Sequence, residues 1–234
     1  MTTKRMLENQ IVLIVGGSSG IGRAVAELAG KNGAHVVIAS RHARENSDCW
    51  AQASDAAIET HAFDITSSED CIELFKSVGP IDHLVITVRP DLTPSPFLQT
   101  EKCQAKTVFD TKLWGPYRLI QVAQRHIREH GSIILTSGIA GEKIYKGAST
   151  MALVNGAIET LGRVLAVELA PLRVNVVSPG FVEPKPKEIQ TYADHFPAGR
   201  VASVHEVAMA YLSLMTNAYI TGTITVIDGG ARLI

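Results

Sequence analysis

The segment 15–22, V-G-G-S-S-G-I-G, constrains the fold of this chain more than any other stretch. An apolar run at 11–15 precedes it and a segment with helical periodicity follows it, which predicts a strand, a glycine-rich loop and a helix. Glycines in such a loop permit a tight turn and a close approach of the backbone to a diphosphate, and the helix N-terminus attracts the anion. An ordinary tight turn would show the same glycines, but the strand before them and the helix after them favour a nucleotide site.

Six further apolar runs follow along the chain, at 34–40, 60–63, 81–88, 132–136, 172–177 and 221–228. Helical patterns separate them, with the longest at 101–129, 153–170 and 203–215. Strands that alternate with helices predict an α/β fold in which helices cover both faces of a parallel sheet. Because the 234 residues show no linker, repeat or low-complexity tract, we expect a single domain over 1–234.

Composition and charge argue against several classes of partner. The formal net charge of −1 gives no electrostatic reason to expect nucleic acid or an anionic membrane as a partner. No apolar run approaches the roughly 18–20 residues that span a bilayer. The cysteines Cys49, Cys71 and Cys103 are widely spaced and lack C-x-x-C pairing, which argues against a disulfide framework and a zinc site. We therefore expect a cytoplasmic protein that binds no metal and acts on a small molecule.

The residue after the second predicted strand indicates which dinucleotide the loop would hold. In NAD sites an acidic residue about 20 positions past the glycine loop binds the ribose 2′-hydroxyl. Here Arg41, preceded by Ser40, stands in that position relative to Gly22. A guanidinium binds a phosphate through paired charge-assisted hydrogen bonds. The position favours NADP(H) as cofactor over the alternative, in which Arg41 is a solvated loop arginine.

Two other segments are predicted at the same edge of the sheet. Asp64 and Ile65 follow the third predicted strand, where the Asp64 carboxylate would either contact an adenine or cap a turn. The segment 184–200 contains prolines and lysines and lacks periodicity, which predicts a mobile lid.

Five motifs resemble the short-chain dehydrogenase/reductase family, in the family's order and spacing. They are I-V-G-G-S-S-G-I-G, F-D-I-T at 63–66, G-S-I-I-L-T-S at 131–137, L-A-V-E-L-A-P-L-R-V-N-V-V-S-P-G at 165–180 and I-T-G-T-I-T-V-I-D-G-G at 220–230. The resemblance implies a Rossmann-type doubly wound parallel sheet of about seven strands, NADP(H) across its top edge, and reduction of a carbonyl or oxidation of an alcohol. It also implies a homodimer or homotetramer, formed through the helices at 101–129 and 153–170 and through the C-terminal strand.

The resemblance places the cofactor contacts on four segments of this sequence. The glycine loop would hold the diphosphate, the end of the second strand the 2′-phosphate, the end of the third strand the adenine, and the turn after the sixth strand the nicotinamide. The residues are Gly16, Ser18, Ser19, Gly20, Ile21, Gly22, Ser40, Arg41, Asp64, Ile65, Pro179, Gly180 and Val182. Thr87 and Val88 stand where the family has N-N-A-G after the fourth strand, and Arg89 replaces the glycine, which would crowd or charge the groove.

The positions of the family's proton relay are all replaced. Aligned on its motifs, the asparagine becomes Lys112, the serine Gly138, the tyrosine Met151 and the lysine Asn155. A thioether, a neutral amide and a missing side chain cannot form the usual relay.

Three nearby side chains are candidates to replace that relay. Lys112 would donate a proton or stabilise negative charge beside the nicotinamide, or else is a solvated lysine on a helix. Ser137, like Thr87, would hydrogen-bond substrate or cofactor, or else is structural. Tyr145, followed by Lys146, would substitute directly for the missing tyrosine, or else belongs to a surface pair.

Three functions follow from this combination. The first is an NADP(H)-dependent oxidoreductase that acts on a small organic carbonyl, alcohol or imine with a non-standard proton donor. The second is a cyclase, isomerase or lyase that keeps the bound cofactor as a structural wall. The third is a catalytically inactive, NADP(H)-binding pseudoenzyme.

Overall fold

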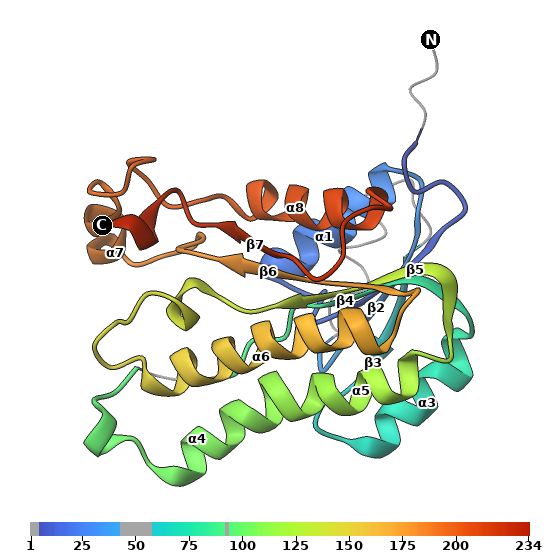
Figure 1. Cartoon of the computed structure of the whole chain (residues 1–234), viewed down its shortest axis with the longest axis horizontal. Helices are drawn as coiled ribbons and strands as arrows, with labels where there is room; N and C mark the ends of the chain where they lie inside the picture. The colour runs from blue at the N-terminus through green and yellow to red at the C-terminus, as the bar shows by residue number, and fades with distance from the viewer. Residues whose placement is uncertain (1–4, 43–57, 92–93) are drawn as a thin grey trace.

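The structure, a computed structural model, describes residues 5–42, 58–91 and 94–234. Its centre is a seven-stranded sheet in the order β3-β2-β1-β4-β5-β6-β7, in which every neighbouring pair is parallel (Figure 1). The strands are β1 Ile11–Val15, β2 His35–Ser40, β3 Ile58–Ala62, β4 Ile81–Ile86, β5 Ile127–Thr136, β6 Arg173–Pro179 and β7 Ile224–Ile227. The predicted Rossmann-type α/β fold is confirmed.

Helices cover both faces of this sheet (Figure 1). One layer consists of α1 (Gly20–Lys31) and α8 (Val204–Thr216). The other layer contains α3 (Ser68–Val78), α4 (Lys102–Phe109), α5 (Gly115–Ala123) and α6 (Ser149–Glu168). A shorter helix, α7 (Lys187–Ala193), lies with the C-terminus at one end of the molecule (Figure 1). This arrangement leaves the loops after the strands free to form a site at the carboxyl edge of the sheet.

The strands supply two separate cores because their side chains alternate between the faces. In β1, Leu13 and Val15 join the core beneath α3, α5 and α6, whereas Val12 and Ile14 join the core beneath α1 and α8. All four side chains are buried. The strands therefore read as continuous apolar runs, as expected for a sheet covered on both sides.

The segment predicted as one helix over 101–129 has a more varied structure. Helix α4 continues through a π-helical turn, η3 (Asp110–Trp114), into α5, which ends at Ala123. The prediction was wrong beyond that point, because β5 begins at Ile127 instead of residue 132. Ile127 pairs with Ile81, and the Arg128 guanidinium binds the Asp82 carboxylate, so contacts with β4 extend the strand through residues without an apolar pattern.

Other predicted boundaries also moved. The helix predicted from residue 153 begins at Ser149, the fourth strand ends at Ile86 instead of residue 88, and the last strand shrinks to Ile224–Ile227. Among the described residues, α6 is the one helix whose length and hydropathy would suit a membrane span. It lies in the helical layer over the sheet, with Val154 and Ile158 in contact with the core.

The predicted lid at 184–200 is not an unstructured loop. It contains α7, whose Ala193 is buried together with Phe196 in a small apolar cluster that also includes Ile139 and Ala231. Contacts with distant parts of the chain order this segment, and a local pattern cannot reveal them. Movement of the lid remains a prediction.

Candidate cofactor groove and reaction centre

The glycine loop after β1 is held against β4 by hydrogen bonds. Gly16 adopts a φ of +86°, a left-handed conformation that favours glycine, and its N–H donates to the Ala39 carbonyl at 2.9 Å. The Thr87 hydroxyl donates to the carbonyls of Val15 (3.1 Å) and Gly16 (3.2 Å). Thr87 therefore positions the loop, which supports the structural alternative for this residue.

Two glycines of the loop have different surroundings. A β-carbon on Gly22 would lie 2.3 Å from the Gly16 carbonyl oxygen and 2.4 Å from Thr87 Oγ1, so only glycine fits there. A β-carbon on Gly20 would meet nothing within 4 Å, so this side of the loop is open. Ser19 caps α1 without using its hydroxyl, which leaves that group available beside the open helix N-terminus. The loop thus fits the diphosphate of a dinucleotide.

The other predicted contacts at this end occupy varied environments. Ser18 is half-buried in the loop, and Ile21 packs against the core under α1. Ser40 ends β2 with a buried Oγ that has no hydrogen-bond partner within the described residues, and Arg41 beside it is exposed. Residues 43–57, which follow, lie outside the described structure. An orphaned hydroxyl beside an exposed guanidinium fits a phosphate at this strand end.

Asp64 and Ile65 have structural roles of their own. One Asp64 oxygen, Oδ1, accepts hydrogen bonds from the Thr66 backbone N–H at 2.9 Å and the Thr66 hydroxyl at 2.8 Å, as a turn-capping residue does. Ile65 is buried in the core beneath α5. Val88, after β4, also packs against this core. The turn-capping alternative for Asp64 is what the structure shows, and an adenine contact remains a prediction.

Lys112 is the central side chain of the reaction centre. It lies on the π turn η3 and is only 6% exposed, and its Nζ donates a hydrogen bond to the Ser137 carbonyl at 2.9 Å. Burial, with a smaller contribution from Arg89, lowers the pKa of Lys112 from 10.5 to about 8, and Glu159 opposes this shift. The alternative of a solvated lysine is therefore wrong.

Ser137 lies at the end of β5 and is also buried. Its hydroxyl donates to Glu159 Oε1 at 2.9 Å, and the Ser178 hydroxyl approaches the same oxygen at 3.4 Å. Ser137 thus connects Lys112, through its carbonyl, with Glu159, through its hydroxyl. Sequence reasoning missed Glu159, although its position one helical turn after Asn155 on α6 was an available signal.

The remaining positions of the replaced relay lie around the same point. A β-carbon on Gly138 would be 3.1 Å from Asn155 Nδ2. Asn155 is buried on α6, and Met151 is half-buried one turn earlier on the same helix. Lys112, Ser137, Gly138 and Asn155 therefore come together at the ends of β5 and α6, as the sequence predicts.

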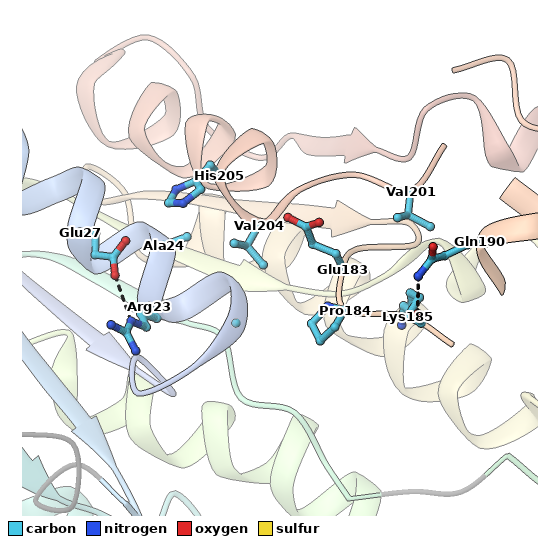
Figure 2. Close-up of a pocket in the computed structure, with 11 residues that line it drawn as sticks. Arg23, Ala24, Glu27, Glu183, Pro184, Lys185, Gln190, Val201, Val204 and His205 are labelled. Atoms are coloured by element: carbon cyan, nitrogen blue, oxygen red, sulfur yellow. Dashed lines mark hydrogen bonds and ion pairs between the residues drawn. The ribbon is translucent and has the colours of Figure 1, made fainter. Parts of the chain in front are cut away.

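The turn after β6 closes the far side of the groove. Pro179 ends β6, the Gly180 N–H donates to the Ile227 carbonyl at 2.9 Å, and Val182 bridges to Ala202. A pocket of about 650 Å³ lies between α1, this turn and the start of α8 (Figure 2). Its wall includes Gly20 of the glycine loop and Lys185. The predicted diphosphate and nicotinamide segments thus border one continuous depression.

Tyr145 does not supply the missing acid. Its ring packs edge-on against Phe181, with centroids 5.8 Å apart, and Phe181 in turn contacts Phe196 and Tyr192 of the lid segment. Burial, with smaller contributions from Tyr192 and Asp228, raises the pKa of Tyr145 to about 12. A proton held this tightly is unsuited to general acid catalysis near neutral pH.

Comparison with known proteins identifies the family. The family model described as enoyl-(acyl carrier protein) reductase matches residues 15–232. This chain belongs to the short-chain dehydrogenase/reductase family. Among SDR relatives, ATR9 of Stachybotrys chlorohalonatus is 36% identical over 250 residues, covering 97% of this chain and 98% of ATR9. The 3-oxoacyl-(acyl-carrier-protein) reductase of Homo sapiens is 31% identical over 242 residues, covering 97% of this chain and 99% of that enzyme.

Two solved structures extend this comparison. A small-chain dehydrogenase in complex with NADPH has a TM-score of 0.81 at 30% identity and covers 97% of this chain and 100% of its own. The reductase/Diels-Alderase MalC of Malbranchea aurantiaca has a TM-score of 0.91 at 30% identity, with 99% of each chain covered. SDR neighbours thus include a protein that binds NADPH and one described by two activities.

Proposed function

We propose that this protein is an NADP(H)-dependent oxidoreductase that reduces a small organic carbonyl or imine, or oxidises the corresponding alcohol, with Lys112 as its proton donor. The observation that carries the proposal is the buried Lys112 ammonium, fixed 2.9 Å from the Ser137 carbonyl at the carboxyl end of β5. In this family the reaction takes place at that edge of the sheet.

The cofactor part of the proposal rests on the glycine loop and the end of β2. The open flank of Gly20 and the N-terminus of α1 would hold the diphosphate, and Ser40 and Arg41 would hold the 2′-phosphate. When bound, the reduced nicotinamide would supply the hydride. A neighbour solved with NADPH supports the choice of the phosphorylated dinucleotide.

The chain's own residues would manage the proton. Lys112 Nζ carries one proton more than the neutral amine, and burial makes the loss of that proton easier than in water. The Ser137 carbonyl holds the ammonium in place, and the Ser137–Glu159 hydrogen bond fixes that strand end. Because the donor must be protonated, we expect the rate of reduction to fall as the pH rises through about 8.

A pH profile of NADPH consumption tests the proposal. Wild type and Lys112→Met are assayed against a panel of aromatic ketones, quinones and cyclic imines, with NADPH affinity measured for each variant. We expect Lys112→Met to retain NADPH binding and to lose at least tenfold in turnover, as is typical when a general acid is removed. Lys76→Met, which changes an exposed lysine on α3, is the matched control. Equal turnover by wild type and Lys112→Met would contradict the role of Lys112.

A second candidate function is a reaction without net hydride transfer, such as a cyclisation. The similarity to MalC, a protein described as both reductase and Diels-Alderase, favours this alternative specifically. Formation of product with no net change in NADPH would support it. Tight NADPH binding without conversion of any substrate would instead indicate a pseudoenzyme.

Assembly and location also belong to this proposal. Large apolar side chains are exposed on the layer formed by η3, α5 and α6, namely Trp114, Tyr117, Leu153, Val164 and Val167. Since solvent-exposed apolar patches favour association, we propose a homodimer or homotetramer in the cytoplasm. Analytical ultracentrifugation tests the assembly, and a monomer at micromolar concentration would contradict it.

A further inference from the structure

Asn155 is a buried polar residue that the protein itself does not satisfy. It is 1% exposed, and its Oδ1 is fully buried with no hydrogen-bond partner. Within the residues that the structure describes, no hydrogen bond to its Nδ2 is found either. Buried polar groups are almost always hydrogen-bonded, because an unpaired one loses its solvation without compensation. A buried carboxamide with both ends unpaired therefore indicates a group that binds something other than the fold.

The carboxamide lies at the reaction centre. A β-carbon on Gly138 would be 3.1 Å from Asn155 Nδ2 and 3.6 Å from the Pro179 carbonyl oxygen, so the amide sits where β5 and β6 end. Gly141 approaches from the same loop, since its β-carbon would be 3.1 Å from Asn155 Cβ. The loop that follows β5 thus rests directly on α6 around this side chain.

The replacements at positions 138 and 155 depend on each other. A contact of 3.1 Å at a β-carbon is tighter than ordinary packing, so any side chain at 138 would displace the Asn155 amide. The amide therefore occupies the space in which the family carries its serine. The result is a single donor, Asn155 Nδ2, in place of the hydroxyl that position 138 lacks.

The charges nearby select the kind of group that this donor would meet. Lys112 approaches the same strand end, and Arg89 lowers the pKa of both Lys112 and Lys185. Two or more cations beside an amide N–H favour an oxygen that accepts hydrogen bonds and gains negative charge, and they disfavour a cationic ligand.

We infer that Asn155 is a substrate-binding residue whose Nδ2 donates a hydrogen bond to the oxygen of a ketone or quinone carbonyl, with Lys112 as the second donor. This inference rests on the proposed function and narrows it, because an iminium substrate has no oxygen for Asn155 and carries the wrong charge. The site therefore favours carbonyl compounds over the imines that the fold alone would allow.

Binding and kinetics with a defined probe test the inference. The probe is 9,10-phenanthrenequinone, measured for binding to the NADP⁺ complex by calorimetry and for reduction by NADPH. We expect Asn155→Ala to weaken quinone binding at least fivefold and to lower kcat/KM by roughly 10²-fold, in the range for a lost oxyanion donor. NADPH affinity should change less than twofold. Unchanged quinone affinity, or an equal loss of NADPH affinity, would overturn the role of Asn155.

Thermal stability separates this role from a structural one. Asn155→Ala removes an unpaired buried amide, so we expect Tm to stay constant or rise. The control is Asn175→Ala, because Asn175 is also buried but donates to the Ile220 carbonyl at 2.9 Å and accepts from the Thr223 N–H at 3.2 Å. That variant should lower Tm. A comparable fall in Tm for Asn155→Ala would show that its amide serves the fold, and would overturn the inference.

Two further results distinguish this inference from the proposed function. Gly138→Ser should impair quinone binding in the wild-type background and restore part of it in the Asn155→Ala background, where the space is free. A protein that binds the quinone through Asn155 but never reduces it would refute the oxidoreductase and leave the binding site intact. A wild type that neither binds nor reduces the quinone, or that reduces N-methyl-3,4-dihydroisoquinolinium faster, would overturn the inference.

Discussion

The buried ammonium of Lys112 should make the stability of the protein depend on pH in a defined window. Its pKa is about 8 in the folded protein, against 10.5 for a free lysine. At about 1.36 kcal/mol per pKa unit, this difference corresponds to roughly 3 kcal/mol. Below pH 8 the folded state carries the full cost of burying the charge. As the pH rises from 8 to 10.5 the folded protein releases its proton first, so the cost disappears and stability rises.

The measurement is urea unfolding of the cofactor-free protein between pH 7 and 10.5, for wild type and Lys112→Met. The methionine keeps the chain length and removes the charge, so titration of all other groups cancels in the difference between the two free energies of unfolding. We expect that difference to shift by about 3 kcal/mol in favour of wild type across this range.

Lys76→Met serves as the control for this experiment. The Lys76 side chain is 64% exposed beside Glu73, so its charge carries no burial cost and its replacement should give a difference that is constant with pH. A constant difference for Lys112→Met as well would refute the reasoning. It would mean that water reaches the Lys112 ammonium, and its assignment as an easily deprotonated donor would fall with it.

Three other perturbations test the groove. Arg41→Ala should weaken NADPH binding at least tenfold while NADH binding changes little, and equal losses in a fluorescence titration would rule out a 2′-phosphate contact. Gly22→Ala would place a β-carbon 2.3 Å from the Gly16 carbonyl oxygen. An overlap of this kind costs about 1–3 kcal/mol, so NADPH affinity measured by calorimetry should fall roughly 10–100-fold, and unchanged affinity would show that the loop is not the diphosphate site. Glu159→Gln removes a charge that raises the Lys112 pKa, so the fall in the rate of reduction should move to lower pH, and an unmoved profile would contradict the coupling.

The fold was predictable because local and long-range signals agree. The run at 11–15, the glycine loop and the helix after it lie where the pattern places them, and the alternation of elements correctly predicts a parallel sheet covered on both faces. The failures lie where tertiary contacts decide. The first part of β5 depends on Ile127 pairing with Ile81, and α7 depends on Phe196 reaching a cluster built from distant segments. Neither contact leaves a periodic pattern in the sequence.

The site was predictable in composition more than in arrangement. The motifs correctly bring Lys112, Ser137, Gly138 and Asn155 to one edge of the sheet. They do not reveal that Lys112 is buried, because its orientation depends on the winding of the helix around it. Glu159 was missed because it belongs to no motif and matters only through its contact with the Ser137 hydroxyl.

The π turn at Asp110–Trp114 has a consequence for how this active site tolerates change in length. A π turn holds one residue more than a regular helical turn, and each residue of a helix advances the winding by roughly 100°. Deleting one residue here would restore regular winding and swing Lys112 away from the sheet, although every other residue of the chain would be kept. The position of the proton donor is thus encoded by a single surplus residue in the helix, and a variant that lost it would keep its fold while losing its chemistry.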